Sequence, residues 1–278
     1  MGELVGVYAA SHAPGLTGWF DDAEEAQRER VLASYRALRG RLEQARPTAL
    51  VMIANDHLLN FPVDDVPDFA VSLAAVHEGP EPWFEAWLNV PPYRVPGHPP
   101  LARTIVREGT RAGIQIRPMD RLRFDDNFSV PLTLLTPAMQ VPLVPITMNT
   151  IMPPRPEPEL CYEVGGVLRR IIEEHTPAEE RVALIATGGL SHEPGGPKYF
   201  AVDEQWDRWF LELLAEGSPE LVLREVTLES MERAGAGGTS EVLAWIVAMG
   251  AVGRRPAQVL GYEPVVAWRC GMGVVAWT

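Results

Sequence analysis

Cysteine is scarce in this 278-residue chain, which contains only Cys161 and Cys270. Two thiols cannot form a disulfide framework or a four-thiolate zinc site, so any bound metal must rely on histidine and carboxylate side chains. Long apolar runs are also missing: the runs are short, such as the strand-sized Ala49–Ala54, and stay far below the roughly 18 residues that a membrane span needs. No basic segment precedes the short apolar stretch at the N-terminus. We therefore expect a cytoplasmic protein that does not bind a membrane.

Positive charge is in short supply as well. The chain has 24 basic against 37 acidic residues, a net charge of −13 and a pI near 4.9, which argues against nucleic acid as a partner and favours a small molecule. Only Lys198 is a lysine, which leaves 23 arginines. Because arginine is so common here, Arg269, which could hold a substrate carboxylate, is interpreted as a solvated surface residue.

What the chain does contain is an alternation of short β-rich apolar runs with helical-period segments. This pattern predicts one α/β domain over residues 1–278, with a mostly parallel central sheet covered by helices on both faces. The predicted strands are Leu4–Ala10, Thr48–Ala54, Phe69–Val76, Ile114–Arg117, Leu143–Thr147 and Val182–Thr187. The predicted helices are Ala23–Ala45, Leu101–Ala112, Glu159–His175, Val202–Ala215 and Ser240–Met249.

Two proline-rich stretches, Gly79–Pro100 and Met148–Pro158, are predicted to be long ordered loops without regular elements. The first carries four aromatic residues, Trp83, Phe84, Trp87 and Tyr93. These either pin the loop to the core or form a lid over a substrate.

His12, His57 and His192 each come a few residues after a predicted strand, at the end of a short polar or glycine-containing turn. Ligand crevices of open α/β sheets form at the carboxyl ends of the strands, so these side chains could converge. One such histidine is usually structural, but three in the same context suggest a site. Histidines with a carboxylate and vacant positions suit non-haem Fe(II), and zinc stays open on ligand chemistry alone. The other histidines, His77, His98 and His175, are expected to be packed or solvated.

A glycine-rich segment, Ala234–Glu241, opens the last predicted helix and places Glu241 in its first turn. Taken alone, this carboxylate complements the helix dipole, and the glycines match neither phosphate-binding fingerprint. Nucleophilic catalysis has no anchor, because the chain has no G-x-S-x-G elbow and neither cysteine has an activating motif.

Six short blocks, in order and spacing, resemble the type III extradiol ring-cleavage dioxygenases, including the catalytic β subunit of protocatechuate 4,5-dioxygenase. They are Ser11-His12-Ala13-Pro14, Asn55-Asp56-His57, Gly97-His98-Pro99, Val130-Pro131-Leu132, Thr187-Gly188-Gly189-Leu190-Ser191-His192 and Ser240-Glu241 followed by Trp245. The resemblance implies a catalytic domain that cleaves a catechol-type aromatic ring with O2. It also implies that His12, His57 and Glu241 bind Fe(II) and that His192 is the acid/base. We further expect a homo-oligomer, with room for a small partner subunit.

One position departs from the family pattern. Asp126 stands where the family carries a second active-site histidine, and an ionised carboxylate only accepts hydrogen bonds. We assign Asp126 a role at the substrate: it either meets a substrate donor, such as an amino or extra hydroxyl group, or is held neutral and donates. The rival interpretations are a metal-binding member of this fold that has lost oxygenation, and a metal-dependent hydrolase.

Overall fold

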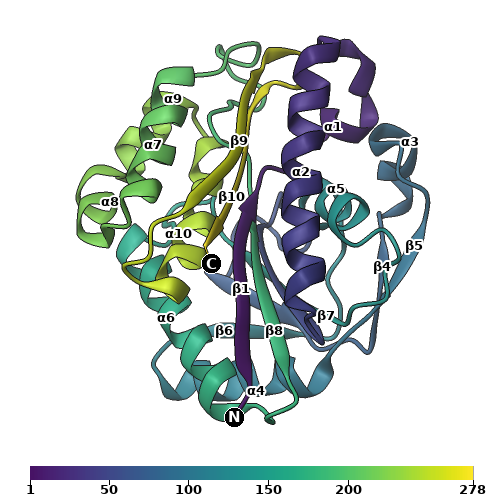
Figure 1. Ribbon diagram of the computed structural model, residues 1–278, viewed down its shortest axis with the longest axis vertical. Helices are drawn as coiled ribbons and strands as arrows, with labels where there is room; N and C mark the ends of the chain where they lie inside the picture. The colour runs from purple at the N-terminus through teal and green to yellow at the C-terminus, as the bar shows by residue number, and fades with distance from the viewer. Residues whose placement is uncertain (278) are drawn as a thin grey trace.

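The computed structural model describes residues 1–277 and is built around one eight-stranded sheet (Figure 1). Its strand order is β6-β3-β7-β2-β8-β1-β10-β9. The four strands β7, β2, β8 and β1 are mutually parallel, and β3 is parallel to β6. Antiparallel pairing joins β3 to β7 and β10 to both β1 and β9. The strands are β1 Glu3–Ala10, β2 Ala49–Asn55, β3 Phe69–Ser72, β6 Ile116–Met119, β7 Leu143–Met148, β8 Arg181–Thr187, β9 Gln258–Val265 and β10 Cys270–Trp277.

Helices cover both faces of this sheet, which confirms the predicted fold class. The central strands are apolar on both sides because alternate side chains enter two cores: Val51 and Ile53 face one, Leu50 and Met52 the other. The first face is covered by α4 Pro99–Arg111, α6 Pro158–His175, α7 Glu204–Glu216, α8 Pro219–Glu225, α9 Leu228–Ala234 and α10 Val242–Val252. The second is covered by α1 Gly15–Gly18, α2 Glu25–Ala45, α3 Glu85–Leu88 and α5 Asp126–Leu135.

The predicted strands and helices are present, but several regions need correction, and α8, α9 and β9 lie outside the predicted elements. The strand predicted over Phe69–Val76 ends at Ser72, and the proline-rich stretch that follows is not an irregular loop. It contains a hairpin of β4 (Val76–Gly79) and β5 (Tyr93–Pro96), with α3 between them. Prolines fit here because they occupy helix starts and strand ends, where no backbone donor is needed. Helix α5 is absent from the prediction because Pro131 lies inside it.

The order of the strands brings the three strand-end histidines to one edge. β8 lies between β2 and β1, so the residues that follow these strands leave the sheet side by side. The start of α5 and the short 3-10 helix η3, Thr239–Glu241, reach the same edge, as their contacts with these residues show. Within residues 1–277, no helix combines the length and apolarity needed to cross a membrane.

Candidate metal centre and its pocket

His12 follows β1 and is buried. Its Nδ1 lies 3.2 Å from the hydroxyl of Thr187, the last residue of β8. That hydroxyl donates to the carbonyl of Asn127 at 2.9 Å, so it accepts a hydrogen bond from Nδ1–H of His12. The tautomer fixed in this way leaves a lone pair on Nε2, which lies 3.3 Å from Oε2 of Glu241.

His57 follows β2 and is held in the same manner by a carboxylate. Its Nδ1 donates to Oδ2 of Asp125 at 3.1 Å and lies 3.5 Å from Oδ1 of Asp126. Its Nε2 lies 3.3 Å from Oε1 of Glu241. Sequence reasoning missed Asp125, because it follows no predicted strand and the helix that it precedes was not predicted. Asp125 is also the N-cap of that helix, α5: its Oδ1 accepts from the backbone N–H of Asn127.

His192 reaches the same point from the glycine turn after β8. Its Nδ1 donates to the carbonyl of Leu190 at 2.8 Å, and its Nε2 lies 3.3 Å from Oε1 of Glu241. The turn requires glycine, because a Cβ at Gly189 would lie 2.6 Å from Sγ of Cys270 and 2.8 Å from the imidazole of His192. The histidine ring therefore lies directly against its own loop.

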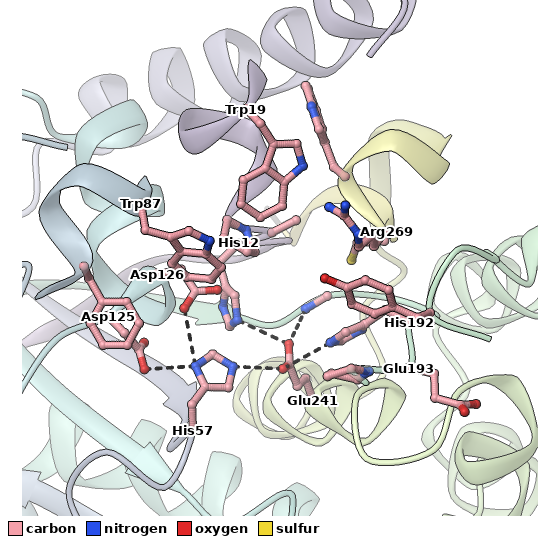
Figure 2. A pocket seen from close by; sticks show the side chains of 18 residues that line it. His12, Trp19, His57, Trp87, Asp125, Asp126, His192, Glu193, Glu241 and Arg269 are labelled. Atoms are coloured by element: carbon pink, nitrogen blue, oxygen red, sulfur yellow. Dashed lines mark hydrogen bonds and ion pairs between the residues drawn. The ribbon is translucent and has the colours of Figure 1, made fainter. Parts of the chain in front are cut away.

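Glu241 is the carboxylate on which all three Nε2 atoms converge (Figure 2). Its Oε1 also accepts from the side-chain amide of Asn55 at 2.9 Å, and its Oε2 accepts from the backbone N–H of Gly189 at 2.6 Å. Burial raises the pKa of this carboxyl, but the imidazoles of His192 and His12 outweigh burial and hold the pKa well below its usual value. The group is therefore a carboxylate with fixed oxygens.

This arrangement fits a divalent metal ion. Each Nδ1 is a donor, so in its neutral form each imidazole presents the lone pair of Nε2 to a carboxylate oxygen at 3.3 Å. Two lone pairs repel, so a proton or a metal ion is needed between them. Burial lowers the pKa of His57, yet Asp125 and Asp126 outweigh it and keep the pKa well above its usual value. Burial and Glu241 compete in the same way at His192, whose pKa is also raised. A site that attracts protons so strongly attracts a cation for the same electrostatic reason.

Asp126 is a second carboxylate close to the histidine pair. His12, His57 and Asp126 each have one potential ligand atom, an imidazole nitrogen or a carboxylate oxygen, and these three atoms lie within 4.8 Å of one another. Figure 2 shows, however, that Asp126 and Asp125 lie on the Nδ1 side of His57, whereas Glu241 lies on its Nε2 side. Burial raises the pKa of Asp126 to about 6.

The cluster forms the floor of a pocket of about 260 Å³. The walls are largely aromatic, formed by Trp19, Phe84, Trp87, Tyr199 and Trp268. Arg269 also lines this pocket, so its interpretation as a solvated surface residue is wrong.

Both interpretations of the aromatic residues in the proline-rich stretch hold in part. Tyr93 pins the hairpin, because its hydroxyl donates to Ser129 at 3.0 Å. Phe84 and Trp87 instead line the pocket, and the ring of Trp87 lies 5.5 Å from that of Trp19. Segments far apart in the chain thus close the apolar side of the pocket.

Comparison with known proteins places this pocket in context. Residues 6–273 match the family described as the catalytic LigB subunit of aromatic ring-opening dioxygenase. A 2,3-dihydroxyphenylpropionate/2,3-dihydroxicinnamic acid 1,2-dioxygenase of Cupriavidus necator is 26% identical over 95% of both chains. A gallate dioxygenase of Pseudomonas putida is 31% identical over 58% of this chain and 47% of its own. An uncharacterized protein of Escherichia coli K12 shares the fold, with a TM-score of 0.59, 17% identity and coverage of 89% and 92% of the two chains.

Proposed function

The chain belongs to the family of catalytic LigB subunits of aromatic ring-opening dioxygenases, the type III extradiol enzymes, and on this premise we propose that it uses Fe(II), held by His12, His57 and Glu241, to cleave a catechol-type ring with O2. The names of its relatives support a substrate with neighbouring ring hydroxyls, since dihydroxyphenylpropionate and gallate both fit that description.

The observation that carries the metal assignment is the meeting of three side chains at 3.3 Å on the pocket floor. Nε2 of His12 and Nε2 of His57 face the two oxygens of Glu241, and the Nδ1 of each imidazole is already bonded elsewhere. Two neutral imidazoles and one carboxylate leave a divalent ion with a net charge of +1. This is the donor set of the non-haem Fe(II) oxygenases, which keep open positions for substrate and O2.

Fe(II) suits the reaction better than zinc, because zinc has no redox chemistry. When bound, Fe(II) supplies open coordination positions and the one-electron chemistry through which a catechol can react with O2. The aromatic walls contributed by Trp19, Trp87 and Trp268 pack against the substrate ring and exclude water from the reacting atoms.

His192 supplies proton transfer in this proposal. Because its Nδ1–H is bonded to the carbonyl of Leu190, only Nε2 is available, and it faces the pocket floor. Nε2 takes a proton from one catechol hydroxyl as the ring is activated and returns it to the opened product. A positioned base of this kind contributes typically 10²–10⁴-fold.

Asp126 is proposed to select the substrate. Its raised pKa of about 6 allows either form near neutral pH: the acid donates a hydrogen bond, and the carboxylate accepts one from a substrate amino or hydroxyl group. If Asp126 meets a substrate donor, Asp126→His loses activity on that substrate and gains it on simple catechols. Wild-type rates for Asp126→His and Asp126→Asn across a substrate panel would show that Asp126 plays no part in selection.

The experiment that tests the proposed function is oxygen uptake by protein loaded anaerobically with Fe(II) and mixed with catechols, gallates and aminophenols. We expect one O2 consumed per ring opened, a yellow product, and loss of activity in air that ferrous salt with a reductant restores. Zinc-loaded protein is the matched control and is expected to be inactive. Activity with zinc and without oxygen uptake would identify a hydrolase instead.

The proposal extends to assembly and location: a homo-oligomer in the cytoplasm, with room for a small partner subunit. Exposed aromatic side chains next to pocket residues support a protein contact there, since Trp83 is 60% exposed and Phe200 is 68% exposed. Light scattering on the purified protein measures the oligomeric state, and a monomeric mass would contradict the homo-oligomer.

A further inference from the structure

Arg269 occupies an unusual place in the pocket wall. It links the 3-10 helix η4 (Val266–Trp268) to β10 and has a left-handed backbone, with φ of 60°. Its guanidinium carbon lies 5.2 Å from the ring centre of Trp19, 4.8 Å from that of Tyr199 and 5.1 Å from that of Phe200. Figure 2 shows it near Trp19, across the pocket from His57. Three rings therefore surround this cation.

The guanidinium lacks a counter-ion. Among the residues that the structure describes, no carboxylate oxygen lies within 4.0 Å of it, and its buried Nε has no hydrogen-bond partner. The one hydrogen bond that the guanidinium makes within the described part of the chain is long, 3.5 Å from Nη1 to the carbonyl of Ala267. Glu193, an acid that also lines the pocket, is held by backbone N–H groups of Lys198 and Ala236. A buried donor without a partner is costly, so the Nε–H of Arg269 favours the binding of an acceptor that residues 1–277 do not provide.

Comparison with the other arginines that lie over aromatic rings shows that the lack of a carboxylate partner is specific to the pocket. Arg28 lies over Phe20, Arg117 over Phe61 and Arg208 over Tyr262. Each of these also pairs with a carboxylate, from Asp21, Asp65 and Glu204 respectively. Within residues 1–277, Arg269 is the ring-stacked arginine without such a pair, although it contacts the most rings.

We propose that Arg269 is a specificity-determining residue of this pocket, whose guanidinium binds a carboxylate group of the substrate. This inference rests on the proposed function, because it assigns a substrate-binding residue in the same pocket. The guanidinium fork matches a carboxylate in two parallel hydrogen bonds. The other carboxylates that line the pocket, Asp125, Asp126, Glu193 and Glu241, repel an anion. In the proposed function the two ring hydroxyls bind at the metal centre, so the substrate carboxylate is placed at Arg269, at the opposite end of the ring. Arg269 thus fixes the direction in which the ring enters.

The kinetic test compares matched acids and their methyl esters: 3,4-dihydroxybenzoate and 3-(2,3-dihydroxyphenyl)propionate, each as acid and as ester. For Arg269→Met, kcat/KM on the preferred acid is expected to fall about 10–100-fold, mainly through KM, because a charge-assisted hydrogen-bond pair is lost. The rate on the ester is expected to stay unchanged. Arg28→Met is the matched control, since it also removes a ring-stacked arginine but lies outside the pocket. Equal losses on acid and ester would overturn the proposal.

A binding measurement tests the same residue without turnover. Calorimetry with benzoate, phenylacetate and 3-phenylpropionate is expected to show at least one that binds wild-type protein about 10–100-fold more tightly than it binds Arg269→Met. The corresponding alcohols are expected to bind both proteins alike. If Arg269→Met melts at a lower temperature than Arg28→Met, Arg269→Lys replaces it and is expected to retain part of the preference for acids. No difference between wild type and variant for any of the three acids would overturn the assignment.

The two proposals fail in distinguishable ways. If no catechol supports oxygen uptake while the acids still bind through Arg269, the proposed function fails and the carboxylate site stands. If esters and acids are cleaved equally well by wild-type protein, the carboxylate site fails and the dioxygenase stands.

Discussion

The two edges of the central sheet use histidine in opposite ways. At the carboxyl edge, His12, His57 and His192 turn their Nε2 atoms toward one carboxylate, Glu241. Near the amino ends of β7 and β8, His77 and His98 instead make structural hydrogen bonds.

His98 caps α4, accepting at Nδ1 from the N–H of Leu101, and its Nε2 lies 2.9 Å from Glu180. His77 stacks on Phe124 and donates to the carbonyl of Leu143.

The difference between the edges comes from the surrounding charges rather than from burial. Burial lowers the pKa of His77 to about 4, because its one hydrogen-bond partner is a neutral carbonyl. Burial also lowers the pKa of His57, but the carboxylates of Asp125 and Asp126 reverse the shift. Buried histidine alone therefore makes a packing residue, and buried histidine among carboxylates makes a cation site.

The largest difference between the two edges is expected when Glu241→Gln is compared with Glu180→Gln in iron content and turnover. Both glutamates lie beside a histidine, but we propose that only Glu241 binds the metal. Glu241→Gln is expected to lose stoichiometric iron and measurable turnover, because its neutral amide cannot balance the ion's charge. Glu180→Gln is expected to keep both. Metal analysis after anaerobic loading, with oxygen uptake on the same samples, checks this; iron and turnover retained in Glu241→Gln would refute it.

His192→Ala is expected to keep its iron and to lose roughly 10²–10⁴-fold in turnover, because the acid/base is removed while the ligands stay. His98→Ala is the counterpart at the amino edge: turnover is unchanged and stability falls by about 1 kcal/mol through the lost N-cap. Loss of iron from His192→Ala would make His192 a ligand and contradict its assigned role.

The pH dependence of unfolding isolates His77. Its folded pKa of about 4 lies below the ordinary 6.5, so the unfolded chain binds the proton more readily. Its contribution to stability is complete above pH 6.5 and is lost as the pH falls toward 4, by up to about 3 kcal/mol. His77→Gln keeps a donor for Leu143 and cannot titrate, so its stability should fall less steeply over this range. Parallel denaturation curves for the two proteins from pH 7 to pH 4 would contradict this.

The smallest expected effect is a difference in Fe(II) affinity between variants of Asp125 and Asp126. Asp125→Asn removes the negative charge and one of the two acceptor oxygens that bind His57 and the N–H of Asn127, so Fe(II) affinity is expected to weaken by about 10–100-fold. Asp126→Asn is expected to keep affinity close to wild type and to change the preference among substrates. Anaerobic equilibrium dialysis measures the Fe(II) affinity of both variants. A larger loss of Fe(II) affinity in Asp126→Asn than in Asp125→Asn would reverse the two roles.

Much of the fold could be predicted because the central strands have simple patterns. Runs such as Leu50–Ile53 are buried on both faces, and the helix over Glu25–Ala45 repeats its apolar residues at helical spacing. Strand β9 was missed because it is an edge strand with an exposed start and no continuous apolar run. Helix α5 was missed because Pro131 argues against a helix locally, while burial on the second face of the sheet stabilises it.

The candidate site was predictable where strand ends or the family resemblance pointed to it. His12, His57 and His192 follow strands, so the topology brings them together. Asp125 and Arg269 have no such local signal. Asp125 meets His57 across 68 positions of sequence. Arg269 is one of 23 arginines, and the rings that surround it come from two distant segments, at Trp19 and at Tyr199–Phe200.

Anomalous diffraction at the iron edge, from crystals grown and loaded with Fe(II) without oxygen, tests the proposed metal centre most directly. We predict one strong peak per chain, bonded to Nε2 of His12, Nε2 of His57 and the carboxylate of Glu241, with His192 and Asp126 outside the coordination sphere. A peak bonded to Asp126 or His192 in place of Glu241, or no peak in this pocket, would contradict the assignment.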